Sequence, residues 1–105
     1  YDVLAAAAEG RDHDPRTAIR TTDGGPDVIP ATLDLAGIEP LLMSAVGKET
    51  ILKEALAPLR DRYEWILVDS PPSLGLLTVN VLAAVDAVLV PMQCEFYALE
   101  GLSQL

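Results

Sequence analysis

The chain has 105 residues, of which 50% are hydrophobic and 22% charged, and its formal net charge at pH 7 is -9. A composition this apolar excludes a disordered tail, and the length predicts one domain. Nucleic-acid binding through phosphates needs clustered Lys and Arg. Residues 63–105 contain neither residue type, so we expect this stretch not to bind DNA itself.

The apolar runs are far shorter than the ~20 residues that span a bilayer, and no basic segment precedes an apolar one at the start. The single cysteine, Cys94, allows no internal disulfide, which is typical of a reducing compartment. We therefore expect a cytoplasmic protein without a membrane span. Because the chain begins at Tyr1 and its last residues read as the opening of a helix, we also expect it to be an internal part of something longer.

Short helices and loops are predicted in the first part of the chain. Residues 1–9 have high helix propensity and stop at Gly10, a residue type that commonly follows a helix. Residues 11–26 are charged and rich in turn formers, which predicts a surface loop. Residues 27–30 are a brief β-branched run closed by proline, which predicts a short strand.

Two further helical segments are predicted next. Asp34 is placed to cap a helix that Pro40 must interrupt or restart, so we expect a short or broken one. Residues 48–59 carry apolar side chains at helical spacing, and Glu49 can pair with Lys53 on the polar side. This pattern predicts an amphipathic helix that covers a sheet. Its apolar stripe consists of Ile51, Leu52, Ala55, Leu56 and Leu59.

A β-loop-α-β unit is predicted over residues 65–91. Residues 65–68 are apolar throughout, which is typical of a central parallel strand covered on both faces. A proline-rich loop follows, then a helical stretch at 76–85 and a second apolar strand at 86–90. The connection is long enough for a right-handed crossover helix. The predicted fold class is α/β, with a parallel sheet in a layered fold.

The best candidate site is the loop after the predicted strand at 65–68, because ligands in open α/β sheets lie beyond the carboxyl ends of strands. Asp69 ends that strand, and a carboxylate there suits Mg²⁺, which prefers carboxylate and water oxygens. The same pattern also fits a solvated loop entry or a helix cap. Two consecutive prolines, Pro71 and Pro72, stiffen the backbone and hold Asp69 and Ser73 in a defined relation.

Two long segments make the chain resemble a known family. The stretch from Asp69 to Asn80 reads D-S-P-P-S-L-G-L-L-T-V-N, and the stretch from Val88 to Leu102 reads V-L-V-P-M-Q-C-E-F-Y-A-L-E-G-L. Both closely resemble motifs of the ParA/Soj family of DNA-partitioning ATPases, in the family order. Shorter pieces upstream are similar to that family too, so the resemblance covers nearly the whole of residues 1–105.

The resemblance implies that residues 1–105 are the central part of a single ATPase domain with a P-loop NTPase-like fold, acting in chromosome or plasmid segregation. It also implies ATP and Mg²⁺ as cofactors, a homodimer that forms on ATP binding, and a centromere-binding ParB-like partner that stimulates hydrolysis. Nucleoid association through non-specific DNA contacts would come from regions outside this chain.

The resemblance also assigns roles by position. Asp69 is similar to the carboxylate that supports Mg²⁺ through water. Residues 93–101 resemble a segment near the subunit interface and receive no catalytic role. The loop that resembles the family's γ-phosphate sensor, and so a cofactor-binding segment, consists of Pro71, Pro72, Ser73, Leu74 and Gly75.

The phosphate-binding motif that the resemblance leads us to expect, K-G-G-x-x-K-T, does not occur in the sequence, and neither does the family's D-x-D-P-Q strand end. Residues 47–50, Gly-Lys-Glu-Thr, resemble a phosphate loop only superficially. Leu42 stands where that pattern needs glycine, and Glu49 stands where it needs Ser or Thr. We interpret residues 47–50 as a turn before a helix. We expect the chain alone not to bind ATP, and the missing motif to lie upstream in the whole protein.

Two other functions stay open as alternatives. A MinD-like ATPase that positions the division site from the membrane would need an amphipathic helix beyond Leu105, and the segment at 93–101 favours partitioning instead. A non-enzymatic signalling or scaffold domain also ends an apolar strand with aspartate, but the proline pair and the absence of a lysine after Asp86 argue against it. His13 and Cys94 are interpreted as a solvated loop residue and a small packed thiol.

Overall fold

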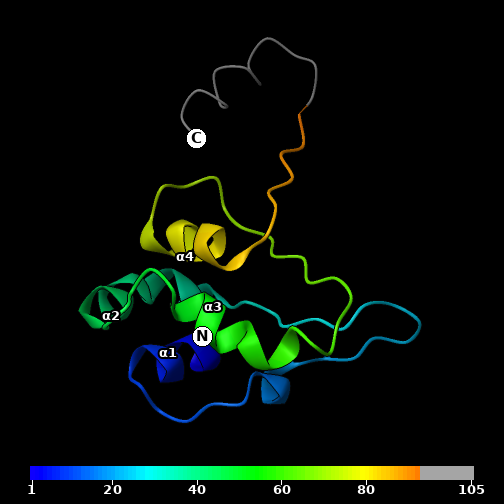
Figure 1. Cartoon of the computed structure of the whole chain (residues 1–105), viewed down its shortest axis with the longest axis horizontal. Coiled ribbons are helices and arrows are strands. Elements are labelled where there is room, and N and C mark those ends of the chain that lie inside the picture. Colours follow the sequence, from blue (N-terminus) through cyan, green and yellow to red (C-terminus); the bar gives the residue numbers. More distant parts are fainter. Residues whose placement is uncertain (93–105) are drawn as a thin grey trace.

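The computed structural model describes residues 1–92. Figure 1 shows α1, α2 and α3 grouped together, with α4 lying against α3. The loop that leads into α4 passes on the side of that helix facing away from α3. The elements in chain order are α1 (Asp2–Ala8), η1 (Pro15–Ala18), η2 (Leu33–Gly37), α2 (Glu39–Ser44), α3 (Ile51–Leu56), η3 (Ala57–Leu59) and α4 (Leu76–Ala84), where η marks a 3-10 helix.

The helix predicted at residues 1–9 is α1, and its end follows from Gly10. This glycine has a φ of 65°, a left-handed conformation that side chains disfavour. The Gly10 amide donates to the Ala7 carbonyl at 3.1 Å, and the Arg11 amide donates to the Ala6 carbonyl at 2.9 Å. These two bonds satisfy the last carbonyls of the helix in the pattern of a Schellman motif.

The segment from 11 to 30 contains one 3-10 helix and one pair of bridging residues. Asp14 caps η1 by accepting from the Arg16 amide at 3.0 Å, and the hydrogen bond from the Arg16 side chain lowers the pKa of the Asp14 carboxyl. The strand predicted at 27–30 is reduced to Val28, which exchanges two backbone hydrogen bonds of 2.8 Å with Arg20. All of residues 27–30 are exposed. The predicted strand was therefore too long, because only one of its four residues pairs with another segment.

One side-chain contact ties that segment to the turn after η3. The Tyr63 hydroxyl donates to Asp27 Oδ2 at 2.7 Å. This hydrogen bond raises the pKa of Tyr63, because ionising the hydroxyl would remove the donor beside a carboxylate. The contact holds the loop of residues 20–28 against the end of the α3–η3 segment.

The prediction of a short, broken helix around Pro40 is confirmed. Pro40 lies in the first turn of α2, where its missing N–H costs no intrahelical hydrogen bond. Asp34 does not cap a helix as predicted. It lies inside the first turn of η2, whose N-cap is Thr32 and has no side-chain capping bond.

The amphipathic helix predicted at 48–59 is divided into α3 and η3, and it begins three residues late. Residues 47–50 form the turn that we expected, since Gly47 has a φ of 67° and its carbonyl accepts from the Thr50 amide at 2.8 Å. The helix packs on α1 and α4 and not on a sheet. The predicted pair of Glu49 and Lys53 does not occur among the ion pairs of the described residues.

The two strands predicted on either side of α4 are not formed within residues 1–92. Trp65 is 79% exposed, Leu67 is 89% exposed, and Leu89 in the second segment is 91% exposed. A parallel strand is stable only when neighbouring strands pair with its backbone, and the described residues contain no such neighbour. The expectation of a strand buried on both faces at 65–68 was therefore wrong here, whereas the helix between the segments is confirmed as α4.

The core is small and lies between the first three helices and the start of α4. Its buried members are Ala5 of α1, Ile38 and Leu42 at α2, and Ile51 of α3. None of the helices described in residues 1–92 has the length and apolar character that crossing a bilayer requires. The partly buried side chains packed on this core are Leu4, Ala7, Ala8, Leu35, Leu41, Ala45, Leu76 and Leu77.

Leu42→Ala tests this core directly. Leu42 is fully buried, so its truncation should lower the free energy of unfolding by about 2–5 kcal/mol through lost burial and a residual cavity. Its neighbour Met43 is 66% exposed, and Met43→Ala should change the same quantity by no more than about 0.5 kcal/mol. Urea unfolding measures both, and equal effects would show that Leu42 is not a core residue.

Candidate functional site

The predicted site is an exposed loop whose far end is fixed to a helix. Asp69, Pro71, Pro72 and Ser73 are all exposed, and Gly75 is half-buried as the N-cap of α4. The Ser73 amide donates to the Pro71 carbonyl at 2.8 Å, which closes a tight turn in the loop. The carboxylate, the two prolines and the serine thus lie on one continuous accessible segment.

A hydroxyl pair joins this loop to α4, and a carboxylate of α2 lies close to its last residue. Ser73 Oγ lies 3.4 Å from Thr78 Oγ1, in the first turn of α4. The Glu39 carboxylate of α2 lies so close to Gly75 that a Cβ at position 75 would meet Glu39 Oε1. Gly75 therefore provides the space for that carboxylate, whose charge at the N-terminus of α4 is favourable to the helix dipole.

The buried amide of Asn80 fixes α4 to α3. Asn80 is 1% exposed and makes three hydrogen bonds. Its Oδ1 accepts from the Leu52 amide at 3.0 Å, and its Nδ2 donates to the Lys48 carbonyl at 2.7 Å and the Leu76 carbonyl at 3.0 Å. A buried amide with its donors and acceptor satisfied is a directional contact.

The segment that follows α4 is held by an ion pair on the surface. Arg60 Nη2 donates to both carboxylate oxygens of Asp86, at 2.8 and 2.7 Å. Both side chains are substantially exposed, so the pair contributes at most about 1 kcal/mol. It nevertheless connects Asp86, two residues after the end of α4, to Arg60 at the end of η3.

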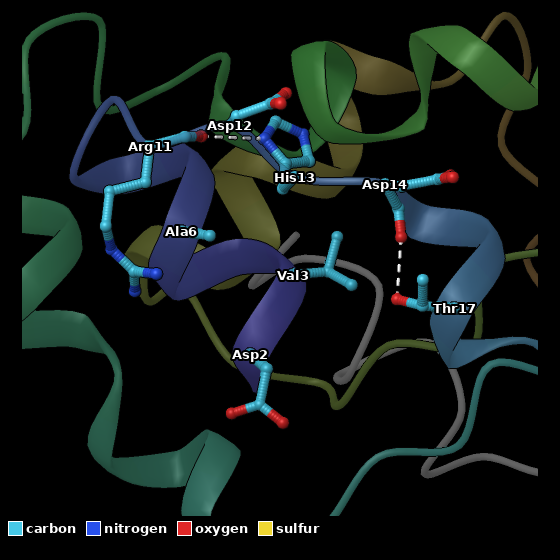
Figure 2. Close-up of a pocket in the computed structure, with 8 residues that line it drawn as sticks. All are labelled: Asp2, Val3, Ala6, Arg11, Asp12, His13, Asp14 and Thr17. Atoms are coloured by element: carbon cyan, nitrogen blue, oxygen red, sulfur yellow. Dashed lines mark hydrogen bonds between the residues drawn. The ribbon is translucent and has the colours of Figure 1, made fainter.

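A cavity with a volume of about 270 Å³ is lined by residues of α1 and of the segment 11–17 (Figure 2), and none of its lining residues belongs to the predicted site. His13 lines it, with Nδ1 3.2 Å from the Arg11 carbonyl and a buried Nε2 that has no hydrogen-bond partner within residues 1–92. His13 lies in a loop, as predicted, but it is only half-exposed and its Nε2 is shielded from solvent. In the same range no group of three or more potential metal ligands occurs. The other lining residues are Asp2, Val3, Ala6, Arg11, Asp12, Asp14 and Thr17.

The sequence predicted the loop but not the roles of Glu39, which lies beside Gly75, and of Asn80, which joins α4 to the α3 segment. Glu39 carries no signal in the sequence, because its proximity to Gly75 arises only from the packing of α2. Asn80 does carry one, since it stands with Thr78 as the polar exception in the apolar run at 76–85. The segment at 93–101 and Cys94 lie outside the described residues, so their predicted roles stay predictions.

A protein-family profile described as an AAA domain matches residues 2–105, so the chain belongs to this AAA-domain family. The resemblance to ParA/Soj-type P-loop ATPases is confirmed by curated relatives. The sporulation initiation inhibitor protein Soj of Bacillus subtilis is 49% identical over 105 residues, which are all of this chain and 40% of that protein. The chromosome partitioning protein ParA of Caulobacter vibrioides is 48% identical over 107 residues, again across the whole chain and 39% of the relative.

A further relative and two solved structures are also similar to this chain. ParA of Myxococcus xanthus is 59% identical over 78 residues, 74% of this chain and 28% of that protein. Crystal structures of cobyrinic acid a,c-diamide synthase from Mycobacterium smegmatis, one with ADP and magnesium and one with an ATP analogue and magnesium, match with a TM-score of 0.83 and 42% identity. Each match covers 96% of this chain and 41% of that one. The P-loop NTPase-like fold class is thereby confirmed, and the chain spans about 40% of the length of these proteins.

Gly75→Ala tests the close approach of Glu39. The backbone at Gly75 has a φ of -72°, which alanine adopts without strain, so any cost must come from the carboxylate. We expect a loss of about 1 kcal/mol in the free energy of unfolding, at the low end for overpacking because the end of a flexible side chain has to move. The same substitution in a Glu39→Ala background should cost nothing. An unchanged cost in that background would exclude Glu39 as the cause.

Proposed function

We propose that the whole protein hydrolyses ATP to drive chromosome or plasmid segregation, and that this chain is the central part of its single ATPase domain. The observation that carries the proposal is the loop at 69–75. Its sequence is that of the partitioning-ATPase motif, it is exposed along Asp69 to Ser73, and it is anchored at the start of α4. The extent of the similarity to Soj and ParA supports the same conclusion.

The cofactors of this proposal are ATP and Mg²⁺. The similar solved structures hold ADP or an ATP analogue together with magnesium. The loop suits them chemically, because Asp69 offers an accessible carboxylate and Ser73 an accessible hydroxyl, and hard cations prefer oxygen ligands. When bound, Mg²⁺ neutralises charge on the phosphates during transfer.

The residues of this chain would then bind and orient the water around Mg²⁺ and the terminal phosphate. Asp69 would accept hydrogen bonds from water on Mg²⁺ and fix that water shell. The Pro71-Pro72 pair would keep the loop from adapting freely, so that Ser73 and Gly75 present a preformed backbone to the terminal phosphate. The contact of Ser73 with Thr78 would hold the far end of that loop to α4.

Phosphate neutralisation requires residues from elsewhere in the whole protein. Residues 63–105 contain no Lys or Arg, and residues 47–50 form a turn that lacks the residues of a phosphate loop. We propose that the lysines come from a phosphate-binding loop upstream, and that this chain alone does not hydrolyse ATP. An ATP-dependent homodimer, a ParB-like partner that stimulates hydrolysis and a cytoplasmic, nucleoid-associated location complete the proposal.

The exposed apolar segments at 65–68 and 86–90 support the proposal that this chain is part of a larger domain. Trp65, Leu67 and Leu89 would be costly to leave in water together. We propose that residues 65–68 and 86–90 pair with strands from the rest of the whole protein, and that Asp69 then stands at the carboxyl edge of a sheet. The length of the solved proteins beyond the matched 41% leaves room for such strands.

The role of Asp69 is tested by Asp69→Asn in the whole protein. Losing the carboxylate that orients the Mg²⁺ water shell should lower ATP turnover by about 10–100-fold, as measured by phosphate release over a range of Mg²⁺ concentrations. Asp86→Asn is the matched control, since Asp86 adjoins the other apolar segment but pairs with Arg60. Its turnover should stay at the wild-type level. Equal turnover in the two variants would contradict the Mg²⁺ role of Asp69.

The pairing of residues 65–68 is tested by Leu67→Asp in the whole protein. If these residues form an enclosed strand there, the substitution buries an unpaired charge and should reduce the yield of folded protein and the unfolding temperature sharply. Leu33→Asp is the control, because Leu33 is 96% exposed and lies in η2. A Leu67→Asp protein as stable as the control would show that residues 65–68 stay uncovered.

A further inference from the structure

The helix α4 follows the loop of residues 69–75, and Leu76 and Leu77 at its start pack against the apolar core. Seven of its nine residues are apolar and do not gather on one face, yet its buried side chains are the polar Thr78 and Asn80. Val79 and Leu82 are 40% and 53% exposed. Because apolar side chains occur on several sides of α4, apolar packing discriminates weakly between rotations of the helix about its axis, and a directional contact defines its register better.

Asn80 supplies that contact, and it does so by capping a different helix. The Leu52 amide belongs to the first turn of α3, where amides have no partner within their own helix. Thr50, the N-cap of α3, makes no side-chain capping bond. Asn80 Oδ1 takes this place from 28 residues further along the chain, and Nδ2 binds the Lys48 carbonyl in the preceding turn.

The same amide reaches back to the start of α4. Asn80 Nδ2 also donates to the carbonyl of Leu76, the first residue of the helix. The residue before it, Gly75, is the end of the loop, and Thr78 in the same turn contacts Ser73. A shift of Asn80 relative to α3 would therefore carry the first turn of α4 with it, and Ser73 and Gly75 would move as well.

We propose that Asn80 is a positioning residue for the ATPase site: by capping α3 from α4, it sets the register of α4 and thereby the position of the 69–75 loop. It does not contact the nucleotide. The proposal rests on the function proposed above, because it assigns Asn80 a task in that site. In this proposal the position of the loop also depends on the turn of residues 47–50, which Asn80 contacts through the Lys48 carbonyl.

The test uses Asn80→Asp in the whole protein, with Lys53→Ala as a control on the exposed part of α3. Aspartate keeps the shape of the side chain and can accept from the Leu52 amide, but it has no donor for the carbonyls of Lys48 and Leu76. A carboxylate oxygen then faces these two carbonyls and is repelled by them, so the register is held by the Leu52 contact alone and shifts. We expect kcat for ATP hydrolysis to fall by about 10–100-fold, because small misplacements of catalytic groups cost this much, with little change in KM. The Lys53→Ala protein should behave as wild type.

Turnover is expressed per nucleotide-binding site, counted by titration with a fluorescent ATP analogue. A purely structural role for Asn80 would reduce the number of sites and leave turnover per site unchanged, which would overturn the proposal. If Asn80→Asp does not fold, Asn80→Ser, which stays polar but is too short to reach α3, is measured in the same way and decides on the same criterion. Absence of ATP hydrolysis by the wild-type protein would instead refute the proposed function.

Discussion

The carboxamide of Asn80 is the contact on which the arrangement of this chain depends. The main apolar cluster is small, with four buried side chains between short helices, and seven of the nine residues of α4 are apolar. Apolar burial is not directional, so it brings α4 to α3 without strongly choosing one register. Two hydrogen bonds of the buried Asn80 side chain, to the Leu52 amide and the Lys48 carbonyl, select that register, and a third joins it to Leu76 of its own helix. The position of the 69–75 loop follows from it, since the loop runs directly into the first turn of α4.

The loop itself combines accessibility with restraint. Its residues Asp69 and Ser73 are exposed, as groups that meet a ligand must be, while its backbone is limited by two prolines and, at its far end, by the Ser73–Thr78 contact and by the Glu39 carboxylate beside Gly75. Preorganised groups stabilise developing charge without the cost of reorganisation during the reaction. Such a loop fits the role that we propose for it beside a phosphate group, and residues 63–105 contain no Lys or Arg to neutralise that phosphate.

Local sequence signals predicted the helices well. Gly10 ends α1, Pro40 sits in the first turn of α2, and Gly47 shapes the turn that an incomplete phosphate-loop pattern resembles. Each of these effects depends on a residue's own backbone preferences, so neighbours in sequence suffice to predict it. The D-S-P-P-S-L-G-L-L-T segment was likewise recognisable because its residues are contiguous.

Apart from two local contacts, the cap by Asp34 and the pair of Glu49 with Lys53, the failures concern interactions between distant residues. The apolar run at 65–68 has the composition of an enclosed strand, but a strand needs partners to pair with, and residues 1–92 hold none. Glu39 approaches Gly75 across 36 positions of sequence, and Asn80 caps a helix 28 positions away. Such contacts arise from packing. A polar residue within an apolar helical run is the one sequence feature that could have indicated the second of them.

The most direct measurement is a crystal structure of the whole protein with an ATP analogue and magnesium. We predict that the Asp69 carboxylate accepts a hydrogen bond from water bound to Mg²⁺, that Ser73 and Gly75 lie beside the terminal phosphate, and that the Asn80 contacts to α3 are intact. A magnesium site built without Asp69, with the 69–75 loop turned away from the nucleotide, would contradict the role given to this loop.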